Sequence, residues 1–271
     1  MKISIVTISY NQAEFIERTI CSVLDQDYNN IEYIVVDAGS TDGSREIIKQ
    51  YETKISKIIF EPDAGPADGL NKGFACATGD IYGFLNSDDI LLPYSLSHVA
   101  NFFQKNMNID VVSGHTIIID EFDRKLRNFY SAKFYLLHYA YESGAFLAQQ
   151  STFFRAETFE KAGRFNIKNK SSWDAELFVN MGLHKAHFSL VNEFWSGFRS
   201  HPESITSSKK LDQQIKEYRK YQFRKIMGRE QSPYDNILKY YFKILKLLQN
   251  KKQLYERLSK GPIYGRAKVS N

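Results

Sequence analysis

The chain has few cysteines and no long apolar segment, and both absences narrow the classes of protein it can belong to. Among its 271 residues only Cys21 and Cys76 are cysteines, and they lack metal-ligand spacing, so a disulfide scaffold is excluded and a reducing compartment fits. No apolar run approaches the roughly 18 residues of a transmembrane helix. Residues 1–8 are too short and too strand-like for a signal peptide. We therefore expect a cytoplasmic protein.

Two glycine-rich phosphate loops are also missing. No Gly-x-Gly-x-x-Gly follows the first predicted strand, which disfavours an NAD-binding domain. The same segment, Ser9–Gln12, has no Gly-rich loop bearing Lys or Arg, which counts against a nucleotidyltransferase.

The net charge of +5 conceals a division of the chain into two parts. Residues 1–207 carry 19 Lys and Arg against 26 Asp and Glu, whereas residues 208–271 carry 17 against 5. We therefore predict a body over residues 1–207 and a basic extension over residues 208–271.

Strand and helix patterns alternate in the first half, which predicts an α/β fold with a mostly parallel central sheet. Asn11 is the predicted cap of the first helix. The predicted strands are 2–8, 31–36, 57–61, 81–87, 110–119, 125–130 and 188–198. The predicted helices are 12–24, 44–51, 66–76, 92–106, 159–163 and 174–182, with two basic amphipathic helices at 209–228 and 234–259.

Acidic side chains follow two of these strands. The run Ile81–Ile90 ends in adjacent carboxylates, Asp88 and Asp89, and Asp37 follows the second strand. Because the carboxyl ends of parallel strands meet at the edge where open α/β sheets bind ligands, we expect these groups to share a site. Carboxylates that share Mg²⁺ or Mn²⁺ with substrate phosphates would explain the adjacent pair, and an ordinary acidic turn is the alternative.

Several spaced motifs together resemble the family 2 glycosyltransferases. They are I-S-I-V-T-I-S-Y-N, then I-V-V-D-A-G-S-T-D-G-S, then G-P-A-D-G-L-N-K-G-F-A-C-A-T-G-D-I-Y-G-F-L-N-S-D-D. The resemblance covers the first 100 residues closely and extends more loosely to residue 207. It implies the GT-A fold and an inverting transfer of sugar from a nucleotide donor.

The resemblance also implies roles for the residues of these motifs. Asp89 would bind Mn²⁺ or Mg²⁺, although Asn86 replaces the first acid of the common motif and leaves the division between Asp88 and Asp89 open. Leu70 stands where many relatives have an arginine, so a phosphate contact is lost. The expected nucleotide-binding residues are Ser9, Tyr10, Asp37, Asp68, Lys72 and Asp88.

Later segments supply the rest of the expected site. His201 resembles a position that closes over the diphosphate and would complete the metal site, with a surface-loop histidine as the alternative. Asp174 resembles the general base that an inverting transfer needs; Glu176 is the alternative base, and an Asp at a helix start is also an ordinary cap. Gln150 and Trp173 would contact the acceptor.

The basic extension allows two interpretations. Its amphipathic helices fit contact with an anionic bilayer, which would suit a lipid-linked acceptor. They fit equally well as helices packed on the catalytic domain. Nucleic acid is not an expected partner, because no basic patch interleaves with the site motifs.

We therefore expect a metal-dependent inverting enzyme that transfers a hexose or N-acetylhexosamine from a UDP-linked donor to a saccharide or lipid-linked saccharide of the cell envelope. The alternatives are a nucleotidyltransferase and a non-catalytic nucleotide-sugar-binding or scaffold protein.

Overall fold

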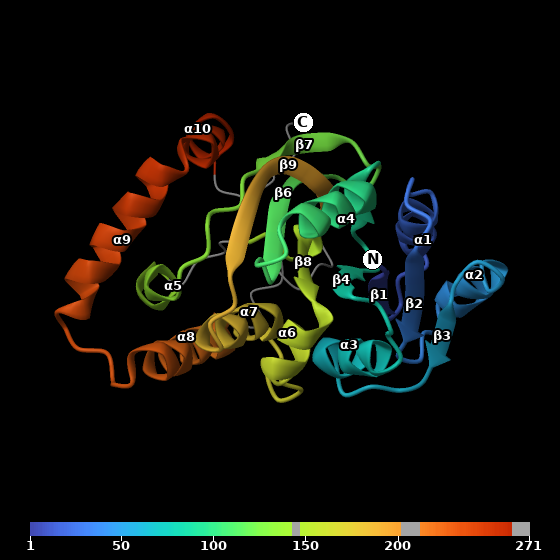
Figure 1. Ribbon diagram of the computed structural model, residues 1–271, viewed down its shortest axis with the longest axis horizontal. Coiled ribbons are helices and arrows are strands. Elements are labelled where there is room, and N and C mark those ends of the chain that lie inside the picture. Colours follow the sequence, from blue (N-terminus) through green and yellow to red (C-terminus); the bar gives the residue numbers. More distant parts are fainter. Residues whose placement is uncertain (143–146, 202–211, 262–271) are drawn as a thin grey trace.

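The computed structural model describes residues 1–142, 147–201 and 212–261, and builds them around one sheet (Figure 1). The strand order is β3-β2-β1-β4-β8-β6-β9-β5, and β7 pairs with β6 outside this path. Strands β1 to β4 are parallel to one another, whereas β8 runs antiparallel between β4 and β6.

The parallel half follows the predicted alternation of strand and helix. Its elements are β1 (Ile3–Ser9), α1 (Ile16–Leu24), β2 (Ile31–Asp37), α2 (Ser44–Gln50), β3 (Lys57–Phe60), α3 (Pro66–Ala75) and β4 (Ile81–Asn86). Ser9 pairs with Asp37, and Ile8 pairs with Asn86. This register brings the carboxyl ends of β1, β2 and β4 to one edge.

The prediction that Asn11 caps the first helix is wrong. The helix begins at Ile16, five residues later, and Asn11 has a positive φ of 51°. Its side-chain oxygen accepts a hydrogen bond from the backbone N–H of Thr41 at 3.0 Å. Asn11 therefore joins two loops at the sheet edge instead of starting a helix.

The second half returns the chain to the same edge. Its elements are β5 (Ile90–Leu91), α4 (Ser95–Lys105), β6 (Val111–Ile119), β7 (Lys125–Phe129), α5 (Leu136–Glu142), the 3₁₀ helix η1 (Gln149–Ser151), β8 (Thr152–Arg155), α6 (Ala156–Lys161), α7 (Trp173–Leu183) and β9 (Phe188–Arg199). The end of β9 pairs with β5, where Ile90 faces Gly197. Residues near 200 therefore lie beside the loop after β4.

Alternate residues of the parallel strands face two hydrophobic layers, as the pleat of a strand requires. Val6 and Ile34 belong to a core with α3, α6 and α7, whereas Ile5 and Tyr33 belong to a core with α1 and α4. Helix α3 lies so close to β1 that a Cβ at Gly73 would come within 2.4 Å of Val6. These layers hold the carboxyl edge rigidly.

The basic extension forms three helices, α8 (Asp212–Met227), α9 (Asp235–Gln249) and α10 (Lys251–Lys260), along one side of the molecule (Figure 1). Tyr141 of α5 packs with Phe223 and Phe242 in a small separate core. The single helix predicted over 234–259 is divided at Asn250, whose side chain accepts a hydrogen bond from the backbone N–H of Gln253 and caps α10. The predicted boundary at residue 207 and the last ten residues lie outside the described ranges.

Within residues 1–142, 147–201 and 212–261, no helix combines the length and apolarity needed to cross a bilayer.

Candidate active site

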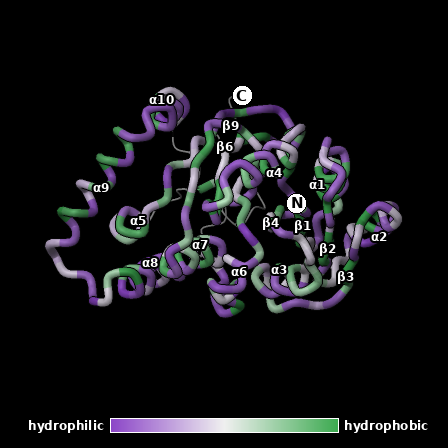
Figure 2. The backbone as a smooth tube through the Cα atoms, viewed as in Figure 1, coloured by the Kyte–Doolittle hydropathy of each residue, from purple (hydrophilic) through white to green (hydrophobic). Residues whose placement is uncertain are grey.

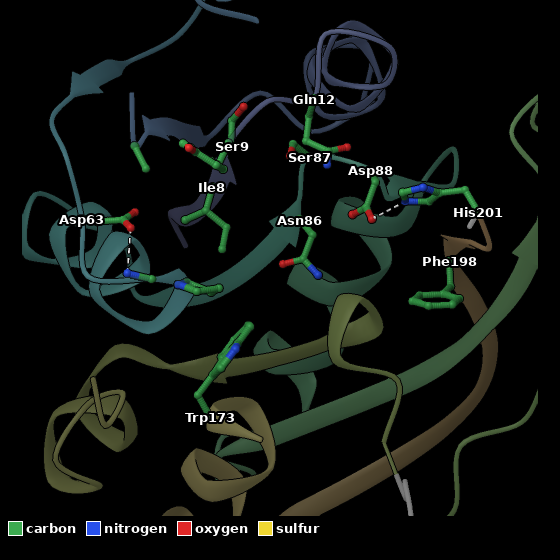
Figure 3. Close-up of a pocket in the computed structure, with 14 residues that line it drawn as sticks. Ile8, Ser9, Gln12, Asp63, Asn86, Ser87, Asp88, Trp173, Phe198 and His201 are labelled. Carbon is green, nitrogen blue, oxygen red and sulfur yellow. Dashed lines mark hydrogen bonds and ion pairs between the residues drawn. The ribbon is translucent and has the colours of Figure 1, made fainter. Parts of the chain in front are cut away.

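A cavity of about 640 Å³ opens at the carboxyl ends of β1 and β4 (Figure 3). Its wall comes from the ends of β1 and β4, from the loops that follow β1, β2, β3 and β4, and from the start of α3. Helix α7 and the end of β9 complete it. The lining residues are Ile8, Ser9, Tyr10, Gln12, Ala38, Asp63, Gly65, Pro66, Asn86, Ser87, Asp88, Trp173, Phe198 and His201. The cavity lies at the edge where the sequence predicts a site.

Asp88 and His201 meet on the cavity wall. Asp88 Oδ2 lies 3.1 Å from His201 Nε2, although 113 residues separate them (Figure 3). The His201 ring is buried and packs on Phe15, with 4.8 Å between ring centroids. Packing fixes the imidazole, so both groups present metal-ligand or phosphate-contact atoms at one place.

Asp89 lies behind this wall, with 1% of its surface exposed. Its Oδ1 accepts a hydrogen bond from the backbone N–H of Arg199 at 3.0 Å, whereas Oδ2 is buried and has no partner among the residues that the structure describes. Burial, and then the charge of Asp88, raise the pKa of Asp89 well above its usual range. The sequence interpretation made Asp89 the metal ligand and Asp88 the ribose contact, but Asp88 is the member of the pair that lines the cavity.

These residues form an incomplete cation site. No group of three or more His, Cys, Asp or Glu side chains able to hold a metal occurs in the described part of the chain. Asp88 and His201 nevertheless supply two donors, and Mg²⁺ sites commonly combine one or two carboxylates with substrate phosphates and water. The donor set therefore fits a cation that binds together with a diphosphate.

The loop after β1 offers polar atoms to the cavity. Ser9 Oγ and Gln12 Oε1 are buried and have no partner among the described residues, and both residues line the cavity. Tyr10 is 62% exposed at its mouth. Because buried polar atoms are normally hydrogen-bonded, the free oxygens of Ser9 and Gln12 are positions where a ligand can bind.

Asp37 is fully buried and does not line the cavity. Its Oδ1 accepts hydrogen bonds from Arg45 Nε at 2.7 Å and from the backbone N–H groups of Gly39 and Ser40. Burial raises the pKa of Asp37, but hydrogen bonds from Ser40, Arg45 and the backbone outweigh it and lower the pKa. Asp37 therefore shapes the loop that carries Ala38 into the cavity.

Asp63 is an acidic cavity residue that the sequence interpretation did not select. Asp68 and Lys72, which it did select, lie outside the lining and form a 3.5 Å ion pair with each other. Asp63 Oδ1 accepts the backbone N–H of Gly65 at 2.8 Å (Figure 3). Burial, with a smaller contribution from the charge of Asp68, raises the pKa of Asp63. The sequence did contain a signal for this residue, since Asp63 comes three residues after the end of β3, at the same edge of the sheet as Asp37 at the end of β2.

Trp173 forms the wall opposite β1 and β4 (Figure 3). It is the first residue of α7, and its ring packs on Phe84 and Phe165 with centroid distances of 5.6 and 5.4 Å. Its predicted partner on the acceptor side, Gln150, is buried in η1 and does not line the cavity.

The two acids after Trp173 differ in their surroundings. Asp174 is half-buried in the first turn of α7, and burial raises its pKa although the backbone N–H of Ala175 opposes the shift. Glu176 is buried and accepts hydrogen bonds from the side chains of Asn166 and Asn169. Glu176 thus holds the loop before α7, whereas no side chain in the described ranges donates a hydrogen bond to Asp174 in this way. Neither acid is among the residues lining the cavity.

Comparisons with known proteins agree with this arrangement. A family model described as Glycosyl transferase family 2 matches residues 4–163. An uncharacterized glycosyltransferase of Nostoc sp. is 39% identical over 130 residues, which are 45% of this chain and 40% of the relative. The putative teichuronic acid biosynthesis glycosyltransferase TuaG of Bacillus subtilis is 43% identical over 90 residues, 32% of this chain and 36% of the relative. The matches thus span about two fifths of these curated relatives.

Solved structures share the fold. S. aureus TarS 1–349 in complex with UDP-GlcNAc gives a TM-score of 0.65 at 18% identity, covering 97% of this chain and 77% of that one. The mannosyltransferase PcManGT of Pyrobaculum calidifontis, in complex with GDP-Man and Mn²⁺, gives 0.64 at 16% identity, covering 97% and 76%. The predicted GT-A architecture is confirmed.

Proposed function

Because the chain belongs to glycosyl transferase family 2, we propose that it is an inverting glycosyltransferase that moves a hexose or N-acetylhexosamine from a UDP-linked donor to a saccharide of the cell envelope. The observation that carries the proposal is the cavity with Asp88 and His201 on one wall and Trp173 on the other. A non-catalytic nucleotide-sugar-binding protein would not need a carboxylate that acts as a general base near Trp173.

The nucleotide lies along the loops after β1 and β2 in this proposal. Tyr10 is exposed at the cavity mouth and offers a flat face to the base, while the oxygens of Ser9 and Gln12 offer hydrogen bonds. Asp63 is the carboxylate on this wall available to a base or ribose. Asp37 and the pair Asp68–Lys72 support the surrounding loops and α3.

Asp88 and His201 are the residues that would hold Mn²⁺ or Mg²⁺ against the donor diphosphate. A cation bound there supplies positive charge next to phosphate oxygens that become more negative as the sugar departs. Asp89 contributes by fixing the loop to the end of β9 through Arg199.

The transfer itself needs one base. The acceptor hydroxyl attacks the anomeric carbon, the bond from that carbon to the diphosphate oxygen breaks with its electron pair, and a carboxylate takes the hydroxyl proton. We assign this carboxylate to Asp174, because it follows the cavity residue Trp173 and burial raises its pKa towards the range useful for a base. Asp63 is the competing carboxylate, since it lines the cavity and its pKa is also raised.

Donor binding and turnover separate these roles. A thermal-shift screen of UDP- and GDP-sugars with and without Mn²⁺ identifies the donor, because a ligand that binds only the folded protein raises its melting temperature. With that donor, Asp174→Asn should lose at least about 100-fold in transfer and in donor hydrolysis while nucleotide binding is kept. Asp63→Asn should instead weaken nucleotide binding. Full turnover in the Asp174 variant would remove its assignment, and failure of every sugar nucleotide to bind would overturn the function.

The acceptor and its setting are also proposals. Helix α9 exposes four apolar side chains at helical spacing, namely Ile237, Tyr241, Ile244 and Leu248, and it exposes Lys239 and Lys243 on another face. Figure 2 shows hydrophobic and hydrophilic positions alternating along α9. This surface supports contact with an anionic bilayer that carries a lipid-linked acceptor. Co-sedimentation with phosphatidylglycerol vesicles, but not with phosphatidylcholine vesicles, is the expected result. Retained sedimentation of an Ile237→Ser, Ile244→Ser variant would contradict it.

A further inference from the structure

A second cavity of about 510 Å³ lies between the sheet and the junction of α9 with α10. Strand β9 connects it to the active site, because Asn192 lines this cavity and Phe198 lines the first. Six residues of extended chain separate these two positions, a distance of about 20 Å. The second cavity is therefore a separate site on the same strand, and Leu248 of α9 and Lys251 of α10 also line it.

The part of its lining that the structure describes carries cations and no carboxylate. Lys133, Lys251 and Lys252 line the cavity, and none of the described lining residues is Asp or Glu. Lys251 and Lys252 are the first two residues of α10. Cations at the amino end of a helix are unfavourable, because the helix dipole already places partial positive charge there. A bound anion would offset both the lysine charges and the dipole. We call this second cavity the lysine cavity.

A buried polar side chain also lines the lysine cavity. His115 of β6 is 5% exposed, and its Nδ1 has no hydrogen-bond partner among the described residues. Its Nε2 lies 3.4 Å from Asn192 Oδ1, which accepts a hydrogen bond from Lys252 Nζ at 2.9 Å. Burial, and to a smaller degree the charge of Lys252, lower the pKa of His115 and favour the neutral form of its ring. Its free nitrogen is suited to a neutral polar group such as a hydroxyl.

Aromatic and aliphatic surfaces complete the lining. Tyr130 packs edge to face on His115 at 5.0 Å, and Lys252 Nζ lies 5.6 Å from the centre of its ring. Lys133 Nζ lies 5.3 Å from the ring of Tyr135. A ligand here meets cations, one neutral imidazole and flat apolar faces together. An inorganic anion can interact only with the cations, whereas a charged sugar can interact with the cations, the imidazole and the apolar ring faces.

We propose that the lysine cavity binds a saccharide bearing a phosphate or carboxylate group, as the part of the acceptor remote from the reacting hydroxyl. The identification of this saccharide with the acceptor rests on the proposed transferase function, whereas the binding site itself does not. The enzyme would then hold an anionic acceptor at two points along β9, and would favour it over a neutral one.

Calorimetric titration of the full chain, with the active site saturated by UDP and Mn²⁺, tests the site. Glucose 6-phosphate and glucuronate are the anionic probes, and glucose and inorganic phosphate are the controls. We expect glucose 6-phosphate to bind at least about fivefold more tightly than either control. The double variant Lys251→Gln, Lys252→Gln should lose at least about tenfold in that affinity.

A matched variant removes the same charge from the same extension. Lys239 and Lys243 lie on α9 outside the lysine cavity, so Lys239→Gln, Lys243→Gln should stay within about twofold of the parent. Equal losses in both double variants, or no loss in the first, would overturn the site. If inorganic phosphate bound as tightly as glucose 6-phosphate, the proposal that the ligand is a saccharide would be wrong. Separate titration with UDP and Mn²⁺ reports on the active site, so failure of the proposed function would appear there and leave the sugar-phosphate result intact.

Discussion

Two polar side chains at opposite ends of the parallel strands, Glu32 and Ser9, differ in their hydrogen bonding. At the amino ends, Glu32 of β2 accepts hydrogen bonds from Lys2, Ser4 and Thr78. At the carboxyl end of β1, Ser9 Oγ is buried and has no hydrogen-bond partner in the described part of the chain, although it lies on the same strand as Ser4. Glu32 thus uses its hydrogen bonds for stability, whereas Ser9 keeps its hydroxyl oxygen available for a ligand.

The largest effect is expected from removing the charge at the carboxyl end. Asp88→Asn should reduce transfer by about a thousandfold and weaken Mn²⁺-dependent nucleotide binding, because Asp88 is the carboxylate beside His201 on the cavity wall. Turnover and nucleotide titration with and without Mn²⁺ measure this loss. Asp27→Asn, at an exposed acid, is the matched control. A variant as active as the control would show that Asp88 has no part in the reaction.

The corresponding change at the amino end should affect folding instead. Glu32→Gln should lower the free energy of unfolding by about 2–3 kcal/mol, because it removes a buried carboxylate that three residues donate to. Nucleotide affinity, measured at low temperature, should be unchanged. Urea denaturation gives the stability, with Glu52→Gln at an exposed position as control. If Glu32→Gln lost nucleotide binding without losing stability, the assignment of Glu32 to folding rather than to ligand binding would be wrong.

The same carboxylate predicts how stability depends on pH. Burial raises the pKa of Glu32, but hydrogen bonds from Lys2, Ser4 and Thr78 outweigh it and lower the pKa from 4.5 to about 2. A lowered folded-state pKa stabilises the protein fully above pH 4.5, and this contribution is lost as pH falls towards 2. The stability difference between parent and Glu32→Gln should therefore shrink over this window. A difference that stays constant down to pH 3 would contradict the prediction.

The smallest effect, and the finest comparison, comes from two serines of β1. Ser4 Oγ donates to Glu32 and accepts from the backbone N–H of Gly79, so Ser4→Ala should cost about 1–2 kcal/mol of stability. Ser9→Ala should change stability by less than about 0.5 kcal/mol, because Ser9 Oγ has no hydrogen-bond partner to lose among the described residues. Nucleotide affinity should fall several-fold in the Ser9 variant alone. Thermal unfolding and nucleotide titration of both variants decide this.

The sequence pattern was sufficient to predict those strands whose apolar runs and flanking turn residues indicate the same structure. Apolar runs bounded by turn residues predicted β1, β2, β4 and the edge they share, because such runs bury in a sheet and parallel strands end together. The break at Asn250 was missed because the apolar spacing continues across it, while the cap on Gln253 ends one helix and starts another.

The roles of single acids were harder to predict. Asp37, Asp68 and Asp88 all belong to the sequence motifs that predicted a nucleotide site, yet of these three only Asp88 lines the cavity. Asp37 is enclosed by Arg45 and its own loop, and Asp68 is paired with Lys72. Exposure of a side chain after a strand depends on loop conformation and on neighbours far along the chain, which spacing does not encode.

The sequence by itself determined the family, the parallel half of the sheet and the edge where ligands bind, because these depend on local patterns and on motifs in order. Only the tertiary structure decided that Asp88 rather than Asp89 lines the cavity, that His201 joins it from 113 residues away, and that lysines of α10 meet His115 of β6 in a second cavity. These contacts depend on where β9 and helices α8–α10 lie against the rest of the sheet. Packing between residues far apart in the sequence determines those positions.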